Sequence, residues 1–186
     1  MSATLQNLAR DLAFLRQAVD RTARMPPAIY FLWAVIVGVG GVVVEQRTWA
    51  VWYWLGASVV GLLASAYLGW RHGVRMGAVS RERGVRAVLH WGGIVAAVFA
   101  ATALVWRGQL AVEAVSGVAL LLVSLGYYLM GVHEDRWSYV PAVLALGAAV
   151  SVTMIPGSWA VAGVACAAGL ALMGVLEWTR ERRRHV

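Results

Sequence analysis

Residues 70–91, WRHGVRMGAVSRERGVRAVLHW, separate two long apolar runs and decide the fold of this chain. Five arginines lie in this stretch: Arg71, Arg75, Arg81, Arg83 and Arg86. Guanidinium groups are too costly to carry through lipid, so the stretch must stay on one side of a membrane. Each flanking run is long enough to cross the hydrocarbon layer once, which needs about 20 apolar residues. The sequence therefore predicts a membrane protein organised around this arginine-rich connection.

The composition of the 186-residue chain agrees with this prediction. Apolar residues make up 61% and charged residues 13%, whereas a soluble domain has about 45–50% and about 25%. All 16 basic residues are arginine, so chemistry that needs a lysine amine, such as Schiff-base formation, is excluded. The net charge of +7 comes from arginines that lie where the membrane topology requires them. We therefore do not expect nucleic acid as a partner. The single cysteine, Cys166, cannot form an intrachain disulfide and is expected to pack in an apolar run.

Residues 4–24 carry the pattern of an amphipathic helix on the N-terminal side of the first apolar run. The apolar positions alternate in spacing between three and four residues: Leu5, Leu8, Leu12, Leu15 and Val19. Such a helix either lies at the membrane surface as an interfacial helix or packs against another helix, and the pattern leaves both open. Pro26 and Pro27 are expected to end it.

Six apolar runs follow, and we expect six transmembrane helices arranged as three hairpins, an all-α fold. The predicted transmembrane domain covers residues 28–178, with spans at about 28–44, 49–70, 87–106, 110–132, 137–155 and 159–178. A basic tail, residues 179–186, completes the chain.

The distribution of arginine predicts the orientation. Fourteen of the 16 arginines fall on the side of the N-terminus, and only Arg47 and Arg107 fall on the other. By the positive-inside rule both termini are expected in the cytoplasm, here of a bacterial inner membrane. The cytoplasmic arginines are expected to attract anionic lipid headgroups; those assigned to this role are Arg71, Arg75, Arg81, Arg83, Arg86, Arg182, Arg183 and Arg184.

The 10 tryptophans fall near the predicted span ends, as expected for two interfacial aromatic belts. Trp49, Trp52 and Trp54 form a cluster that is denser than a belt requires. Glu113 lies one helical turn inside the outer end of the fourth span. Together these four residues are the candidate ligand-binding or partner-binding surface on the outer side.

Small residues recur at every fourth position of the second span, at Ala57, Gly61, Ser65 and Gly69. Shorter stripes occur in the third and sixth spans: Gly93, Ala97 and Ala101, and Gly163, Ala167 and Ala171. Close backbone approach along such stripes holds transmembrane helices together. We expect them to serve helix packing, either within this chain or with another protein.

Few residues offer chemistry. The centres of the predicted spans contain no ionisable side chain, which weighs against ion-coupled transport. His90 and His133 are the histidines that could offer an imidazole to a haem or chlorophyll, and solvated interfacial histidines are the alternative. No protease motif or phosphate-binding loop is present. We therefore expect no catalytic residues, no metal site and no bound cofactor.

The chain resembles two groups of membrane proteins. The motif DLAFLR at residues 11–16, followed by a proline-containing joint before the first span, resembles the start of small, uncharacterised six-span proteins of the bacterial inner membrane. This likeness covers about 25 residues and the span count, and it implies the fold and the membrane but no activity. In size and span number alone the chain is similar to the substrate-binding subunits of energy-coupling-factor vitamin importers, whose longer outer loops it lacks.

The expected function is that of a non-enzymatic membrane protein acting through helix–helix contacts. It would be an accessory or stabilising subunit of a larger membrane complex, or a signalling partner, bound to another membrane protein or to copies of itself. The alternative is a small-solute transporter or its membrane substrate-binding subunit, with the tryptophan cluster and Glu113 at its mouth.

Overall fold

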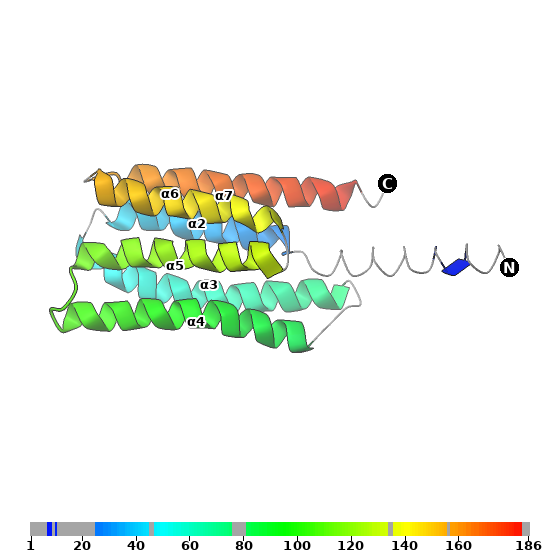
Figure 1. Ribbon diagram of the computed structural model, residues 1–186, viewed down its shortest axis with the longest axis horizontal. Coiled ribbons are helices and arrows are strands. Elements are labelled where there is room, and N and C mark those ends of the chain that lie inside the picture. Colours follow the sequence, from blue (N-terminus) through cyan, green and yellow to red (C-terminus); the bar gives the residue numbers. More distant parts are fainter. Residues whose placement is uncertain are drawn as a thin grey trace.

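The computed structural model describes residues 7, 8, 10, 25–44, 47–75, 81–133, 136–155 and 157–183. In this part of the chain every regular element is helical (Figure 1). The elements are α2 (Pro27–Val44), α3 (Arg47–Arg75), α4 (Arg81–Trp106), α5 (Val112–His133), the 3-10 turn η1 (Arg136–Ser138), α6 (Tyr139–Met154) and α7 (Trp159–Arg182). All six α-helices are long and apolar enough to cross a membrane, which confirms the predicted number of candidate spans.

The predicted amphipathic helix over residues 4–24 lies outside the described residues except at three positions. Asn7, Leu8 and Arg10 are helical and exposed, and the side chain of Leu8 is 58% exposed. The motif at residues 11–16 lies outside the described residues altogether.

Three helices extend beyond the predicted spans, and all three do so where arginines lie. α3 continues to Arg75, α4 begins at Arg81, and α7 continues to Arg182. The arginine-rich stretch, which we expected to be a loop, is therefore mostly helical, because it consists largely of the end of α3 and the start of α4. Lipid thickness does not set where a helix stops, and arginine is a good helix former. An ion pair between Arg86 and Glu82, with 2.6 Å between Nη2 and Oε1, also spans one turn of α4.

The two ends of the bundle differ in their connections. Pro27 and Arg183 lie at one end, which we call the terminal end; at the other, the turn end, lie the connections α4–α5 and α6–α7 (Figure 1). Both of these turns contain a glycine in the left-handed region, Gly108 at φ 68° and Gly157 at φ 82°. A side chain at either position would strain the backbone, so glycine permits these connections to be short.

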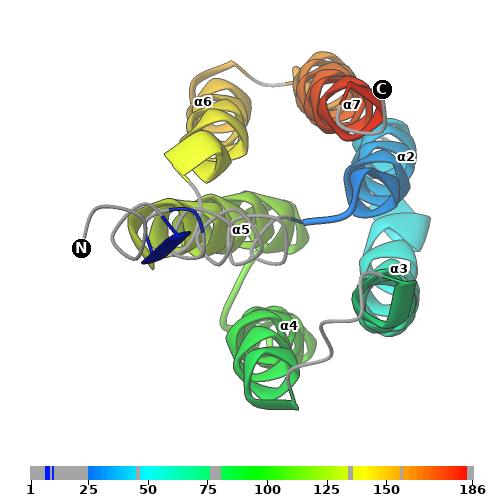
Figure 2. The same ribbon diagram turned by 90° about the vertical axis from the view of Figure 1, so that its right-hand side faces the viewer.

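Seen end-on, the helices follow one another around a ring that α7 closes against α2 (Figure 2). The main hydrophobic core lies among α2, α5, α6 and α7, with Tyr30, Tyr127, Cys166 and Met173 among its buried members. No buried member of this core, within the described residues, comes from α3 or α4. Within the 18-residue apolar stretch of each helix, 44% of the residues are buried in α2, but only 11% in α3 and 17% in α4. Therefore α3 and α4 form an open side of the bundle.

Candidate functional site

The closest helix contact in the bundle joins α2 to α7 through glycine. A Cβ atom on Gly41 would lie 2.7 Å from the Cα of Gly163 and 2.9 Å from the carbonyl oxygen of Trp159. One turn along, a Cβ on Gly38 would lie 3.2 Å from the Cβ of Ala167. Thus the small residues predicted in the last span pack within the chain. Their partners in α2 were not predicted, although the run Gly38–Gly41, GVGG, was a visible signal.

The small residues of α3 are used differently. The indole of Trp33, from α2, lies over Gly61, and its Nε1 donates a hydrogen bond of 3.0 Å to the Oγ of Ser65. By contrast, nothing lies within 4 Å of the position a Cβ would take on Gly69, and Ala57 is half-buried. The middle of this stripe therefore packs within the bundle, while its terminal end is open.

The tryptophans at the turn end do not form one surface. Trp49 and Trp52 are 64% and 61% exposed, and the Trp52 ring lies 6.2 Å from that of Trp106 on α4. Trp54 turns inward instead, so that a Cβ on Gly40 of α2 would lie 2.5 Å from its Cζ2. The side chain of Glu113 lies outside the described residues. The structure thus separates Trp54 from the predicted outer cluster and leaves Trp52 and Trp106 as an exposed pair.

His90 lies between α4 and α5, where it makes a hydrogen bond. Its Nε2 is 3.1 Å from the carbonyl oxygen of Gly126. Because a carbonyl only accepts, Nε2 must carry the hydrogen, and only Nδ1 retains a lone pair. The ring also meets Trp91 edge-on at 5.2 Å, and Trp91 in turn meets the buried Tyr127 at 5.0 Å. This geometry fits a histidine that joins two helices, and ligation through Nε2 would require the bond to break.

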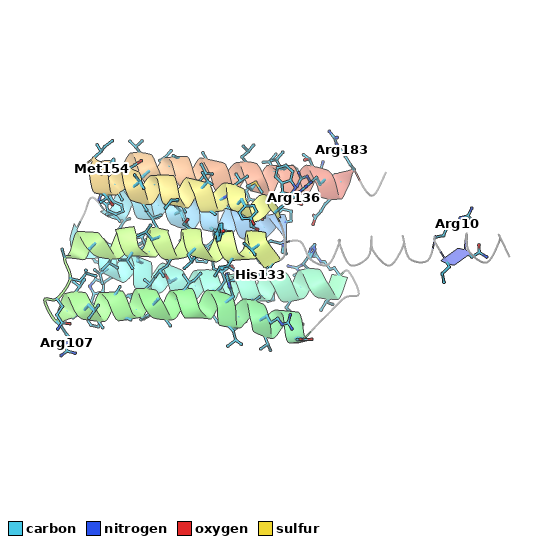
Figure 3. The ribbon with its side chains drawn as sticks, viewed as in Figure 1. Arg10, Arg107, His133, Arg136, Met154 and Arg183 are labelled. Carbon is cyan, nitrogen blue, oxygen red and sulfur yellow. The ribbon has the colours of Figure 1, made fainter. Side chains whose placement is uncertain are left out.

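The second predicted histidine, His133, is exposed at the end of α5 (Figure 3). Among the residues that the structure describes, no three histidine, cysteine, aspartate or glutamate side chains come together in a way that could hold a metal ion.

A charged group is buried at the terminal end of α7. Glu177 is 4% exposed and forms an ion pair with Arg180 one turn further along. The Arg180 guanidinium carbon lies 4.6 Å from the ring centroid of Trp137 in η1. A buried charge needs a partner of opposite charge, and here that partner is also held by an aromatic ring. This cluster, Glu177, Arg180 and Trp137, fastens the connection before α6 to α7. No pattern in the sequence predicted this cluster.

The other arginines of the terminal end are mostly exposed. Arg71 and Arg75 on α3, Arg86 on α4, and Arg182 and Arg183 at the end of α7 all lie on the surface. The side chains of Arg81 and Arg83, and the whole of Arg184, lie outside the described residues. Figure 3 places Arg183 and Arg136 at the terminal end and Arg107 at the turn end, the arrangement that the arginine count predicted.

The segment at the start of α4 is exposed on every side. All six residues from 84 to 89 are exposed, which is more than one complete turn of helix, and the side chain of Leu89 is 70% exposed. Further along α4, Gly93, Ala96, Ala100 and Ala103 are exposed as well, and nothing lies within 4 Å of a Cβ built on Gly93. We call the exposed surface of residues 84–103 the α4 face. It combines apolar surface with small residues that a neighbouring helix could approach closely.

Comparison of the chain with protein-family models, with curated proteins and with solved structures finds no match. The two resemblances described above therefore stay predictions.

Proposed function

We propose that this protein is a non-enzymatic integral membrane protein that acts as an accessory or stabilising subunit, and that the α4 face is where a transmembrane helix of another subunit binds. The proposal follows from the exposed small residues of this face, Gly93, Ala96, Ala100 and Ala103, which lie next to the exposed apolar side chains of Val88 and Leu89.

One observation carries the proposal, which is the lack of packing around residues 84–89. A transmembrane helix in a closed ring normally faces its neighbours on one side and lipid on the other. Here, within the part of the chain that the structure describes, neither side of this helix segment is covered. Since lipid gives no advantage to hiding one apolar helix from another, close approach at small residues is the main source of association. Gly93 and Ala100 supply such positions on the same helix.

The transporter alternative has less support. It needs the tryptophan cluster to form one mouth, whereas Trp54 faces α2 and Gly40. The exposed pair of Trp52 and Trp106 is instead typical of aromatic side chains at a membrane interface.

The proposal is tested by placing a photo-crosslinking residue at one of two exposed leucines in the native host. Leu89 is on α4, and Leu172 is on α7 with 59% exposure. We expect crosslinks to one protein from position 89 and only lipid adducts from position 172. Equal protein crosslinking at both positions, or none at position 89, would contradict the α4 face.

A matched pair of substitutions completes the test. Gly93 on α4 and Gly147 on α6 are both exposed, with nothing within 4 Å of a built Cβ. Gly93→Leu is expected to abolish the complex that survives purification in mild detergent, and Gly147→Leu to leave it intact. The mass of the complex distinguishes a different subunit from a second copy of this chain, and a second copy would overturn the accessory role.

We also propose a bacterial inner membrane location with both termini in the cytoplasm. The support is the arginine distribution, together with the position of Pro27 and Arg183 at the same end of the bundle (Figure 1). A reporter that is active only outside the cytoplasm should be active when fused after Arg107 and inactive when fused after Arg183. The reverse pattern would refute the orientation.

A further inference from the structure

α7 presents a continuous exposed stripe that ends in arginine. From Val161 to Arg182 its members lie three or four residues apart and so share one side of the helix, and Arg183 follows directly at the helix end. In order toward the terminal end they are Val161, Val164, Ala168, Leu172, Val175, Thr179, Arg182 and Arg183. The opposite side of α7 is buried against α2 and α6, at Gly163, Cys166 and Leu170. The stripe is therefore an apolar track that leads directly to two cationic side chains.

The guanidinium of Arg182 is held in place by an indole ring. Its Cζ lies 4.0 Å from the ring centroid of Trp178, which is itself 45% exposed. Stacking uses the face of the planar guanidinium and leaves its edge N–H groups available to an anion. Those N–H groups match two oxygens of a phosphate, which makes arginine well suited to bind it. Arg182 is thus oriented before any ligand arrives.

Among the residues that the structure describes, the two arginines at the end of the stripe have no carboxylate partner. Within the described residues Arg180 is paired with Glu177 and Arg86 with Glu82, but no ion pair involves Arg182 or Arg183. Arg183 points away from the bundle at the end of α7 (Figure 3). Two consecutive cations without an ion pair among the described residues, beside a tryptophan of the kind found at headgroup level, favour a phosphate over a carboxylate-bearing protein surface.

We propose that the end of α7 binds one anionic phospholipid, with its phosphate between Arg182 and Arg183 and its acyl chains along the exposed stripe. The site depends on the membrane and not on the proposed subunit contact, because α4 lies away from α7 in the ring (Figure 2). A free phosphate ion has the same headgroup chemistry but would make no use of the apolar track.

The arginines of α3 provide the comparison that makes the site specific. Arg71 and Arg75 are exposed like Arg182 and Arg183, but the two arginine–indole stacks among the described residues involve only Arg180 and Arg182. We therefore expect Arg71 and Arg75 to contribute only a diffuse attraction to anionic headgroups.

The test uses the full-length protein in detergent, supplemented with phosphatidylglycerol or with phosphatidylcholine of the same acyl chains, and native mass spectrometry. The wild type is expected to retain one phosphatidylglycerol in clear preference to phosphatidylcholine. Loss of each arginine should weaken retention roughly fivefold, so the double variant Arg182→Gln, Arg183→Gln should lose most of it. The control Arg71→Gln, Arg75→Gln removes the same charge and should retain the lipid.

Three outcomes would overturn the proposal: equal retention of the two lipids, equal loss in the α3 control, or displacement of the lipid by excess inorganic phosphate. The last would assign the site to a free anion. Unfolding in lipid-free detergent checks that both double variants fold. Should the α7 variant not fold, Trp178→Leu, which keeps both charges but removes the stacking ring, is expected to weaken retention, and unchanged retention there would refute the site.

Discussion

Helix α2 has a neighbour on each side, and the two contacts are built differently. Against α7 it places backbone on backbone where Gly41 meets Gly163, although nearer the terminal end the Phe31 ring lies over Gly174. Against α3 it places aromatic rings on glycine: Trp33 lies over Gly61, and Trp54 lies over Gly40. The first contact brings the helices as close as their backbones permit, whereas the second keeps them apart by the thickness of a ring.

This difference explains why one half of the molecule is closed and the other open. A backbone contact gains van der Waals energy along several turns, and lipid cannot enter it. An aromatic contact holds at discrete points, and α3 accordingly depends on side-chain hydrogen bonds such as that from the hydroxyl of Tyr53 to the carbonyl oxygen of Ile36, 2.5 Å long. The closed half contains the main hydrophobic core, and the open half, α3 and α4, is the less buried part, where we propose that a partner binds.

Adding one methyl group in each half is expected to have the largest difference in effect. Gly41→Ala should lower the free energy of unfolding by about 2–3 kcal/mol, since its Cβ would meet the backbone of α7, which cannot move aside cheaply. Gly93→Ala on the open side meets nothing within 4 Å and should leave the stability of the purified protein nearly unchanged. Chemical unfolding in detergent, followed by circular dichroism, measures both. Equal effects would show that the two halves are packed alike.

A second comparison removes one charge in each half. Glu177 is buried in the closed half and pairs with Arg180, so Glu177→Gln leaves a partly buried cation without its carboxylate and should cost about 1–3 kcal/mol. Glu82→Gln removes the partner of Arg86 on the exposed start of α4, and such a pair contributes at most about 0.5 kcal/mol. The same unfolding experiment gives both values. A cost for Glu82→Gln as large as that for Glu177→Gln would contradict the exposure assigned to residues 84–89.

Features that depend on whether a residue prefers lipid or water could be predicted from the sequence. Features that depend on how two helices pack against each other could not. The number of candidate spans followed from apolar length, and the grouping of arginines at one end followed from charge. The stripe at Ala57, Gly61, Ser65 and Gly69 was visible, but its division into a packed and an open part depends on where the Trp33 indole lies, which spacing along one helix does not encode.

The terminal-end cluster shows a second limit. Glu177 lies on the same side of α7 as the buried Leu170, Met173 and Gly174, but a charged residue only a few positions from the basic tail is not expected to be buried. Its burial results from the contact of α7 with η1 through Arg180 and Trp137, residues more than forty positions apart. Likewise, the three aromatic residues Tyr53, Trp54 and Trp52 are consecutive in sequence, and only packing against α2 determines which of them faces lipid.

The smallest expected effect concerns the hydrogen bond from Trp33 to Ser65, one of those that join α2 to the open half. In a double-mutant cycle with Trp33→Phe and Ser65→Ala, we expect a coupling of about 0.6 kcal/mol, which is typical of side-chain hydrogen bonds between transmembrane helices. Trp33→Phe alone should cost more than this coupling, because the smaller ring also gives up contact with Gly61. Unfolding of the four proteins of the cycle measures each term. A coupling indistinguishable from zero would mean that Trp33 holds α3 through ring packing alone, and at this point the aromatic contact would then differ from the glycine contact in geometry but not in the kind of force that maintains it.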